Sequence, residues 1–216
     1  RAVVAPIATA RGLAQYAVSS TGSIVWAVTP VPTSLSPFEL GWWSPSGFQS
    51  AADEIRRLRG ATLSPDGTRV AGVIVEGSRA DVWLADVDRG TATRLTHTGI
   101  NVSPIWSTDG RTVYYASRSD GVFSIWSRDT DGTRPATRLA AVDGSRHAFP
   151  VAVSSDGTRL AFLQTASGRR TDLWVLPLRG GPPRVIVSGP FDDSAASFSP
   201  DSRLVAFQSA DTGRWE

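Results

Sequence analysis

A tight turn of nearly constant sequence recurs along this chain and limits what the chain can fold into. It reads SPDGTRV from Ser64, STDGRTV from Ser107 and SSDGTRL from Ser154. The glycines of these turns follow one another, starting at Gly22 in the divergent copy SSTG, at steps of 45, 43 and 47 residues, and Ser202 takes the same place after a further 45. A fixed period of about 40 to 50 residues is typical of stacked supersecondary units. The sequence therefore predicts one structural unit repeated about five times.

Each repeat contains four short apolar runs, for example ATLS, RVAGVIV, DVWLAD and ATRLT. They are rich in β-branched and aromatic residues and are bounded by Gly, Asp, Ser and Pro, as strands joined by hairpins are. A tryptophan follows each turn glycine by 16 or 17 residues, at Trp83, Trp126 and Trp174, where packing between adjacent sheets needs a large ring. We predict an all-β fold: a β-propeller of four-stranded antiparallel blades, with about five repeats present and the last incomplete.

The chain of 216 residues, 41% of them hydrophobic, is long enough for a single domain. We expect one β-propeller domain or fragment over residues 1–216, with repeats at roughly 13–60, 61–101, 102–147, 148–193 and 194–216. Ala2–Ile7 reads as the outer strand of a preceding blade, and the last repeat has only its first two strands. We therefore expect an open arc with apolar surface exposed near Val205 and Phe207. Ser50–Gly60 has helical spacing, but the repeat favours loop and strand there.

The turn residues themselves suit a structural role. Asp-Gly supplies the positive φ that a tight hairpin turn needs, and the serine that opens each turn, such as Ser64, can hydrogen-bond back to it. We therefore predict that the turn aspartates stabilise the turns and are neither catalytic nor metal ligands. Ser202 shows that the turn position accepts a side chain in the last copy.

Several longer phrases point to a known family. LSPDGTRVA, PIWSTDGRTVYYASRSDG, DLWVLPL and ASFSPDSRLVAFQSADTGRWE resemble the WD40-like repeats of TolB-type propellers. More narrowly, together with the opening LAQYAVSSTGSIVWA, they resemble the propeller that follows the kinase domain and membrane span of bacterial serine/threonine protein kinases. The resemblance covers residues 13–216. It implies a non-catalytic binding module, the sensor domain of a receptor kinase on the periplasmic or extracellular side of a bacterial membrane. The alternatives are the propeller of a prolyl-oligopeptidase-type serine peptidase and a free TolB-like periplasmic protein.

Composition and motifs argue against catalysis by this stretch of chain. It contains no Cys, so thiolate zinc sites and Cys nucleophiles are excluded. It also has no Lys and therefore no phosphate-binding loop of the G-x-x-x-x-G-K type, and no G-x-S-x-G elbow. The net charge of +2 is spread without a basic run, which disfavours nucleic acid, and no apolar run reaches the roughly 18 residues of a spanning helix. We expect no cofactor.

Loops between blades and between the second and third strands of each blade should meet on one of the two faces of the propeller, and loops on such a scaffold carry function. We expect a protein or peptide partner there, or a small polar ligand, and self-association through the incomplete end blades is a further expectation. A metal site at the two histidines and an ion pair between Arg118 and Asp120 are alternatives to this interpretation. The candidate residues are His97, Asn101, Arg118, Asp120, His147, Phe149, Asp192 and Asp193.

Overall fold

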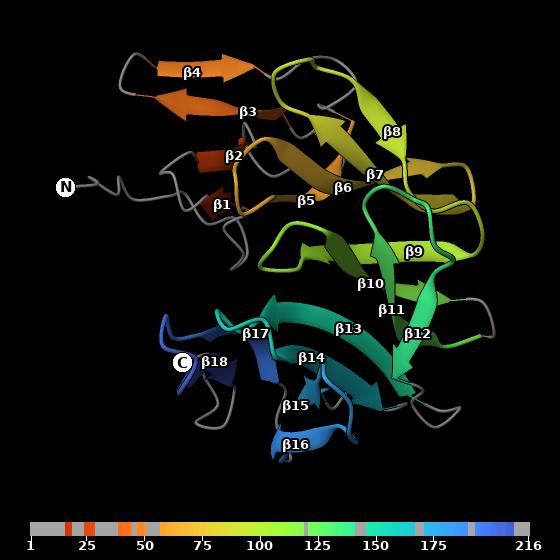
Figure 1. Ribbon diagram of the computed structural model, residues 1–216, viewed down its shortest axis with the longest axis vertical. Helices are drawn as coiled ribbons and strands as arrows, with labels where there is room; N and C mark the ends of the chain where they lie inside the picture. The colour runs from red at the N-terminus through yellow and green to blue at the C-terminus, as the bar shows by residue number, and fades with distance from the viewer. Residues whose placement is uncertain are drawn as a thin grey trace.

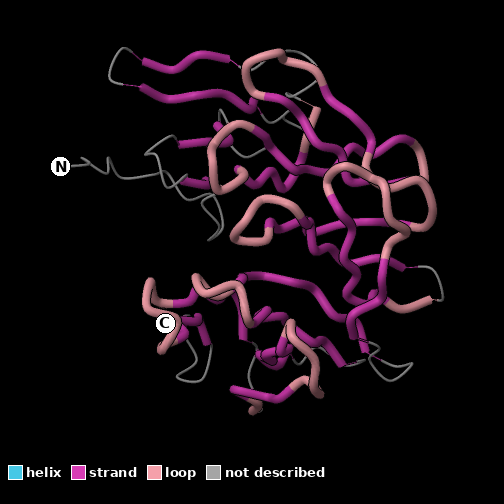
Figure 2. Tube along the Cα trace, viewed as in Figure 1, coloured by secondary structure: helices cyan, strands magenta, loops and turns pink. Residues whose placement is uncertain are grey.

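The structure, a computed structural model, describes residues 57–118, 121–139, 146–165, 171–189 and 195–209 in full. It describes the backbone alone of residues 16–18, 24–28, 39–44, 47–50, 140, 166, 193 and 194. Every regular element in these residues is a β-strand (Figure 2). The described residues include no helix that could cross a membrane.

The strands form five consecutive groups, one for each repeat. The first group contains β1 (Tyr16–Val18), β2 (Ile24–Val28), β3 (Glu39–Ser44) and β4 (Gly47–Ser50), and the second contains β5 (Arg59–Leu63), β6 (Arg69–Glu76), β7 (Arg79–Asp86) and β8 (Ala92–Arg94). The third contains β9 (Ile100–Trp106), β10 (Thr112–Arg118), β11 (Phe123–Asp129) and β12 (Thr137–Ala140). The fourth contains β13 (Arg146–Val153), β14 (Arg159–Ala166), β15 (Thr171–Pro177) and β16 (Arg184–Val187), and the fifth contains β17 (Asp193–Phe198) and β18 (Val205–Ser209).

Within each group, consecutive strands pair antiparallel, and the groups follow one another around an open arc (Figure 1). The second and third groups are also joined by one parallel pair, Ala80 of β7 with Ile100 of β9. We call the groups the first to fifth sheets. The predicted all-β propeller of four-stranded antiparallel blades is confirmed, and within the described residues the last group has two strands. The candidate outer strand Ala2–Ile7 lies outside the described residues.

Residues 51–56 of the alternative helix also lie outside the described residues. The end of that segment follows the repeat, because Arg59 and Gly60 begin strand β5. Leu58, just before the strand, is buried among apolar residues of the second sheet. Burial of this leucine against the sheet favours the strand over the local helical spacing.

Apolar side chains on both faces of the middle strands pack between neighbouring sheets. In β6, Val70 joins a cluster with Leu63, whereas Ala71 points the other way and joins Trp106 of the third sheet. Two further clusters link the third sheet to the fourth and the fourth to the fifth, the last of them including Phe198. The alternation of side chains along a strand therefore buries both faces of the second, third and fourth sheets.

The tryptophans that mark the repeats lie at these contacts, as the sequence predicts. Trp83, Trp126 and Trp174 each pack, partly buried, against a different cluster. The ring of Trp174 stacks on that of Phe162, with centroids 6.2 Å apart. Their role is therefore to fill the space between sheets.

The repeated turns all have the backbone conformation that the sequence predicts. The φ angle is +75° at Gly67, +67° at Gly110, +68° at Gly157 and +60° at Ser202. Each loop is longer than a two-residue hairpin: the Gly67 N–H donates to the Ser64 carbonyl at 2.9 Å, and the Ser64 N–H donates to the Arg69 carbonyl at 2.8 Å. The four turns lie at equivalent ends of successive sheets, and we call this side of the molecule the turn face (residues 64–69, 107–112, 154–159 and 199–204).

Candidate functional site

The turn aspartates are held by hydrogen bonds within their own turns. The Ser64 hydroxyl donates to Asp66 Oδ1 at 2.6 Å, and the same oxygen accepts the Thr68 N–H at 3.0 Å. Equivalent bonds form at Asp109, Asp156 and Asp201. The serine hydroxyl and the backbone N–H together lower the pKa of all four carboxyls, that of Asp156 to about 2. The predicted hydrogen bonds that hold these aspartates within their turns are confirmed.

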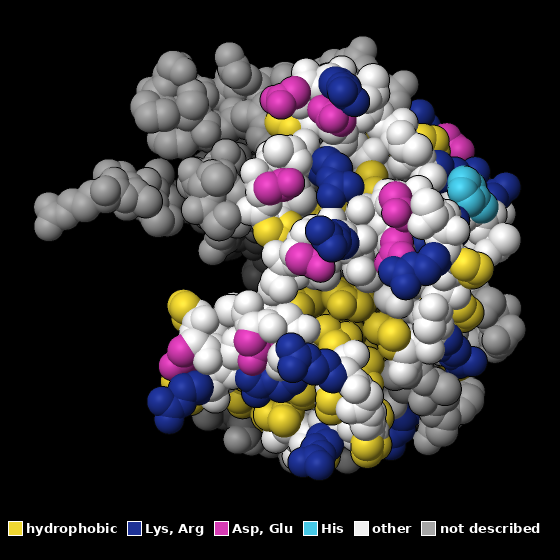
Figure 3. Space-filling view, viewed as in Figure 1, with side chains coloured by type: hydrophobic (Ala, Val, Ile, Leu, Met, Phe, Trp, Pro, Cys, Tyr) yellow, Lys and Arg dark blue, Asp and Glu magenta, His cyan; other side chains and the backbone are white. Residues whose placement is uncertain are grey.

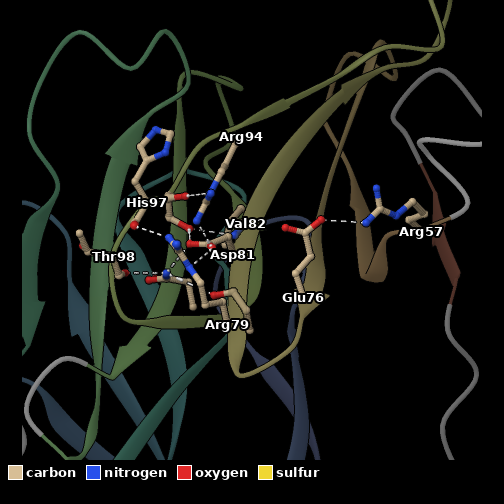
Figure 4. A network of polar contacts seen from close by, with 11 residues as sticks. Arg57, Glu76, Arg79, Asp81, Val82, Arg94, His97 and Thr98 are labelled. Carbon is tan, nitrogen blue, oxygen red and sulfur yellow. Dashed lines mark hydrogen bonds and ion pairs between the residues drawn. The ribbon is translucent and has the colours of Figure 1, made fainter.

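A buried carboxylate connects the second sheet to the third (Figure 4). Asp81 of β7 is 4% exposed. It forms an ion pair with Arg94 of β8 and accepts the Thr96 hydroxyl at 3.0 Å. The Nδ2 of Asn101 donates to the same carboxylate at 3.2 Å and to the Thr98 carbonyl at 2.8 Å. Because a buried carboxylate must be paired and hydrogen-bonded, this network fixes the start of β9 against β7.

The structure therefore places Asn101 differently from the sequence analysis, which put it on the exposed loop face. Its side chain is 1% exposed. A partner could reach it only by breaking the bond to Asp81. Since the neighbouring Ile100 makes the parallel pair with Ala80, the start of β9 is covered by β7, and Asn101 serves the contact between sheets.

Three of the predicted residues come together at the contact between the third and fourth sheets. Arg118 ends β10, and His147 and Phe149 lie in β13. Phe123, the first residue of β11, joins them. We call these four side chains the aromatic–arginine cluster. Because Arg118 and Phe123 flank the connection at the end of β10 away from Thr112, the cluster lies on the face opposite the turn face.

The cluster is held by ring contacts and one hydrogen bond. The Phe123 ring centroid is 5.1 Å from that of Phe149 and 5.7 Å from that of His147. The Arg118 guanidinium carbon lies 5.3 Å from the Phe123 centroid, within the range of a cation–π contact. The Phe123 N–H donates to His147 Nδ1 at 3.1 Å, so Nδ1 is the acceptor in this contact. Arg118 is exposed and the three rings are half-buried, which leaves aromatic surface and a cation open to a partner.

The other candidates do not join this cluster. His97 is exposed before β9, and its carbonyl accepts a hydrogen bond from Arg79 at 2.8 Å. The other histidine of the alternative metal site, His147, lies within strand β13 and not in a loop. Asp193 begins β17 opposite Ser209. Asp120 and Asp192 lie outside the described residues. In the described part of the chain, no three His, Asp or Glu residues are grouped so that they could hold a metal ion.

Phe123 was not among the sequence candidates, although a signal for it exists. It directly follows the SRSDGV connection, at the point where the third strand of the repeat begins. In the structure its ring contacts those of His147 and Phe149 in β13, the first strand of the following repeat. The cluster has no nucleophile or paired carboxylates, so what it offers is recognition: a flat apolar surface with one guanidinium.

Known proteins share the fold and part of the sequence. The family described as TolB beta propeller domain matches residues 53–214. The Tol-Pal system protein TolB of Anaeromyxobacter dehalogenans is 33% identical over 145 residues, which make up 66% of this chain and 32% of that protein. This chain thus spans about a third of the length of that curated relative.

Solved structures agree on the fold. TolB from Acinetobacter baumannii superimposes with a TM-score of 0.73 at 20% identity, covering 89% of this chain and 47% of that one. A structure from an analysis of two prolyl endopeptidases gives a TM-score of 0.64 at 18% identity, covering 88% of this chain and 31% of that one. At these identities the likeness concerns the fold alone.

Proposed function

The chain belongs to the TolB beta propeller domain family, and from this premise we propose that it is a non-catalytic binding module for a protein or peptide. The observation that carries the proposal is the aromatic–arginine cluster. Aromatic residues and arginine are enriched at the centres of protein interfaces. Here the three rings lie half-buried and Arg118 lies exposed on one face, supported by two packed sheets.

Charge supports a protein partner over a strongly charged polymer. In Figure 3, basic and acidic side chains alternate over successive sheets on the face in view. The whole chain has a net charge of only +2. A surface that carries both positive and negative charges recognises a partner through local charge complementarity and not through one long-range electrostatic field.

Residues 1–216 act in this proposal as one propeller domain or fragment. We place it on the periplasmic or extracellular side of a bacterial membrane, as the sensor part of a receptor serine/threonine kinase. The support for the kinase is the resemblance of LSPDGTRVA, DLWVLPL and the opening LAQYAVSSTGSIVWA to kinase-linked propellers. The Tol-Pal name of the curated relative supports a bacterial binding protein in general.

A second candidate is the propeller half of a serine peptidase of the prolyl-oligopeptidase type. The fold shared with the prolyl endopeptidase structure favours it. The rest of the polypeptide distinguishes the two candidates. A kinase domain and a membrane span before this stretch support the sensor, whereas a hydrolase domain with G-x-S-x-G after it supports the peptidase.

Photo-cross-linking tests the binding face. Benzoylphenylalanine replaces Phe149 in the cells that make the protein, and replaces Val185, an exposed residue of β16 (45%), as the matched control. We expect a discrete cross-linked protein from position 149 and none from 185. Arg118→Ala in the same background should lower the yield. Equal products from both positions, or no effect of Arg118→Ala, would contradict the proposed face.

We also propose that the fifth sheet mediates self-association. Leu204 and Phe207 are 70% and 40% exposed, whereas Val205, expected to be exposed, packs against the fourth sheet. Sedimentation equilibrium should show a mass that rises with concentration, and Leu204→Glu should abolish the rise. Val75→Glu, at a residue of β6 that is 52% exposed, is the control and should leave it unchanged. A wild-type protein that stays monomeric at all concentrations would refute self-association.

A further inference from the structure

A second surface, separate from the aromatic–arginine cluster, lies between the second and third sheets. It is a groove of about 400 Å³ between β8 on one side and the end of β11 with its following turn on the other. Leu84 and Leu95 provide apolar lining, and Thr93 of β8 and Thr130 beyond β11 line it from opposite sides. This volume lies within the range of about 300–1,000 Å³ that is common for ligand sites. In Figure 3, basic side chains (dark blue) gather beside a histidine (cyan) at the right of the molecule.

The charged lining of the groove is mostly basic. Four arginines line it: Arg69, Arg89, Arg94 and Arg128. Two aspartates also line it, and in each of them a carboxylate oxygen accepts hydrogen bonds within a local turn. Asp86 Oδ1 accepts the Arg89 N–H at 2.8 Å, and Asp131 Oδ1 accepts the Thr133 N–H at 3.0 Å and its hydroxyl at 2.8 Å. The surplus of arginine makes the groove attractive to anions.

Two of the arginines are already engaged and two are not. Arg69 donates to the Gly110 carbonyl, and Arg94 pairs with Asp81. In the described part of the chain, no hydrogen bond or ion pair involves the guanidinium of Arg89 or Arg128. The Nε of Arg128 is buried and has no acceptor. A buried donor without an acceptor is costly, and a carboxylate can accept from Nε and Nη of one guanidinium together.

The backbone of β8 adds a second kind of binding group. The Thr91 carbonyl and the Leu95 N–H both bond to the β7 side, at 2.9 Å and 2.8 Å. Because bonding direction alternates along an antiparallel strand, Ala92 and Arg94 direct their N–H and C=O groups away from β7. In the described residues, β8 pairs with β7 alone. A free strand edge of this kind can bind an extended peptide.

We propose that this groove binds an extended acidic peptide segment, whose carboxylates pair with Arg89 and Arg128 and whose backbone adds to the free edge of β8. The positive charge of the groove favours acidic side chains in the peptide, and the free edge of β8 favours a peptide with an extended backbone. This surface goes beyond the binding face proposed above and does not depend on it.

Fluorescence anisotropy with a labelled hexaglutamate peptide tests the proposal at low and high salt. We expect binding that weakens with salt, and a loss of affinity of about tenfold in each of Arg89→Glu and Arg128→Gln. Arg184→Glu is the matched control, because Arg184 is exposed on β16, outside the groove. It should change affinity by less than about twofold. Arg89 lies exposed in a turn, so its variant tests the groove even if Arg128→Gln unfolds.

Two further probes separate a peptide groove from a simple anion pocket. A hexaglutamate with N-methyl groups on alternate residues keeps its charge but cannot pair as a strand, and it should bind more weakly. Inorganic phosphate should compete poorly. Equal loss in Arg184→Glu, equal binding of the methylated peptide, efficient competition by phosphate, or no binding at low salt would each overturn the proposal.

Discussion

The Nη2 of Arg69, in the second sheet, donates a hydrogen bond of 2.7 Å to the carbonyl oxygen of Gly110 in the turn of the third sheet. The same guanidinium lies 5.0 Å from the ring centroid of Trp106. The contact repeats two sheets further on, where Arg159 donates to the Ser202 carbonyl and lies over Phe198. The turn face is therefore bridged across sheets by arginines.

Replacing Arg69 by lysine should weaken this bridge while keeping the charge. Lysine lacks the planar fork that stacks on an indole and donates at the same time. We expect the free energy of unfolding to fall by about 1–2 kcal/mol in urea titrations. Arg111→Lys, at an exposed residue of the next turn, is the control and should change it by less than about 0.5 kcal/mol. Equal losses would show that the bridge adds nothing.

Gly157 and Gly110 form a natural comparison between two turns with the same backbone. Their φ angles are +68° and +67°. A Cβ at position 157 would lie 2.7 Å from Thr108 Oγ1, whereas the nearest atom at position 110 would be 3.7 Å away. Gly110→Ala should therefore lower the free energy of unfolding by the strain of a positive φ, about 1–2 kcal/mol. Gly157→Ala should lower it by clearly more.

The double variant Thr108→Ala/Gly157→Ala identifies the cause of this difference. Removing the hydroxyl should bring the cost of Gly157→Ala down to that of Gly110→Ala in thermal or urea melts. An unchanged cost in the Thr108→Ala background would mean that the contact with Thr108 is not responsible.

The sequence predicts the repeat, its strands and its turns well, because these depend on local chemistry that recurs. The positive φ at Gly67 and the serine-to-aspartate bond at Asp66 follow from residues within one turn. Gly72 is a position that the repeat does not explain. At its register in the next two sheets stand Tyr115 and Phe162, each opposite a tryptophan. Only the structure shows that the site is filled by Leu58, whose Cβ would lie 2.8 Å from a Cβ at position 72.

The grouping of the candidate residues was predictable in part. Arg118, His147 and Phe149 lie together because adjacent repeats meet side by side, which the repeat pattern predicts. Asn101 was misplaced because its partner Asp81 lies twenty residues away in the preceding sheet, and no local pattern indicates that pairing. Contacts between sheets depend on how neighbouring repeats are arranged in space, and the sequence of a single repeat does not determine that arrangement.

Acid should destabilise the protein through its turns. Hydrogen bonds, first that from Ser154, lower the pKa of Asp156 from its ordinary 3.8 to about 2. A carboxyl whose pKa is lower in the folded state stabilises that state above its unfolded pKa, and this contribution is lost as the pH falls through the folded value. The pKa values of Asp66, Asp109 and Asp201 are shifted in the same direction. We expect the loss between about pH 4 and about pH 2.

Urea titrations across this pH range measure the effect. Asp156→Asn no longer titrates, so it should lose less free energy of unfolding on acidification than the wild type. Asp88→Asn changes an exposed aspartate outside these turns and should behave as the wild type does. A wild-type stability that stays constant down to about pH 2 would contradict the role assigned to the turn carboxylates.

The network around Asp81 should behave as one unit. Asp81→Ala leaves the guanidinium of Arg94 without its carboxylate and the amide of Asn101 without one acceptor. Breaking a buried pair by removing one partner costs about 3–5 kcal/mol. Arg94 is 26% exposed and water can partly replace the carboxylate, so we expect a value near the low end.

Asn101→Ala should cost less, because Asp81 keeps Arg94 and Thr96. If the Asn101 side chain stabilises the sheets through Asp81, the double variant should lose less than the two single variants together, with a coupling of about 0.5–3 kcal/mol. Strict additivity in urea titrations would instead mean that Asn101 acts through its bonds to the carbonyls of Ala80 and Thr98 and not through Asp81.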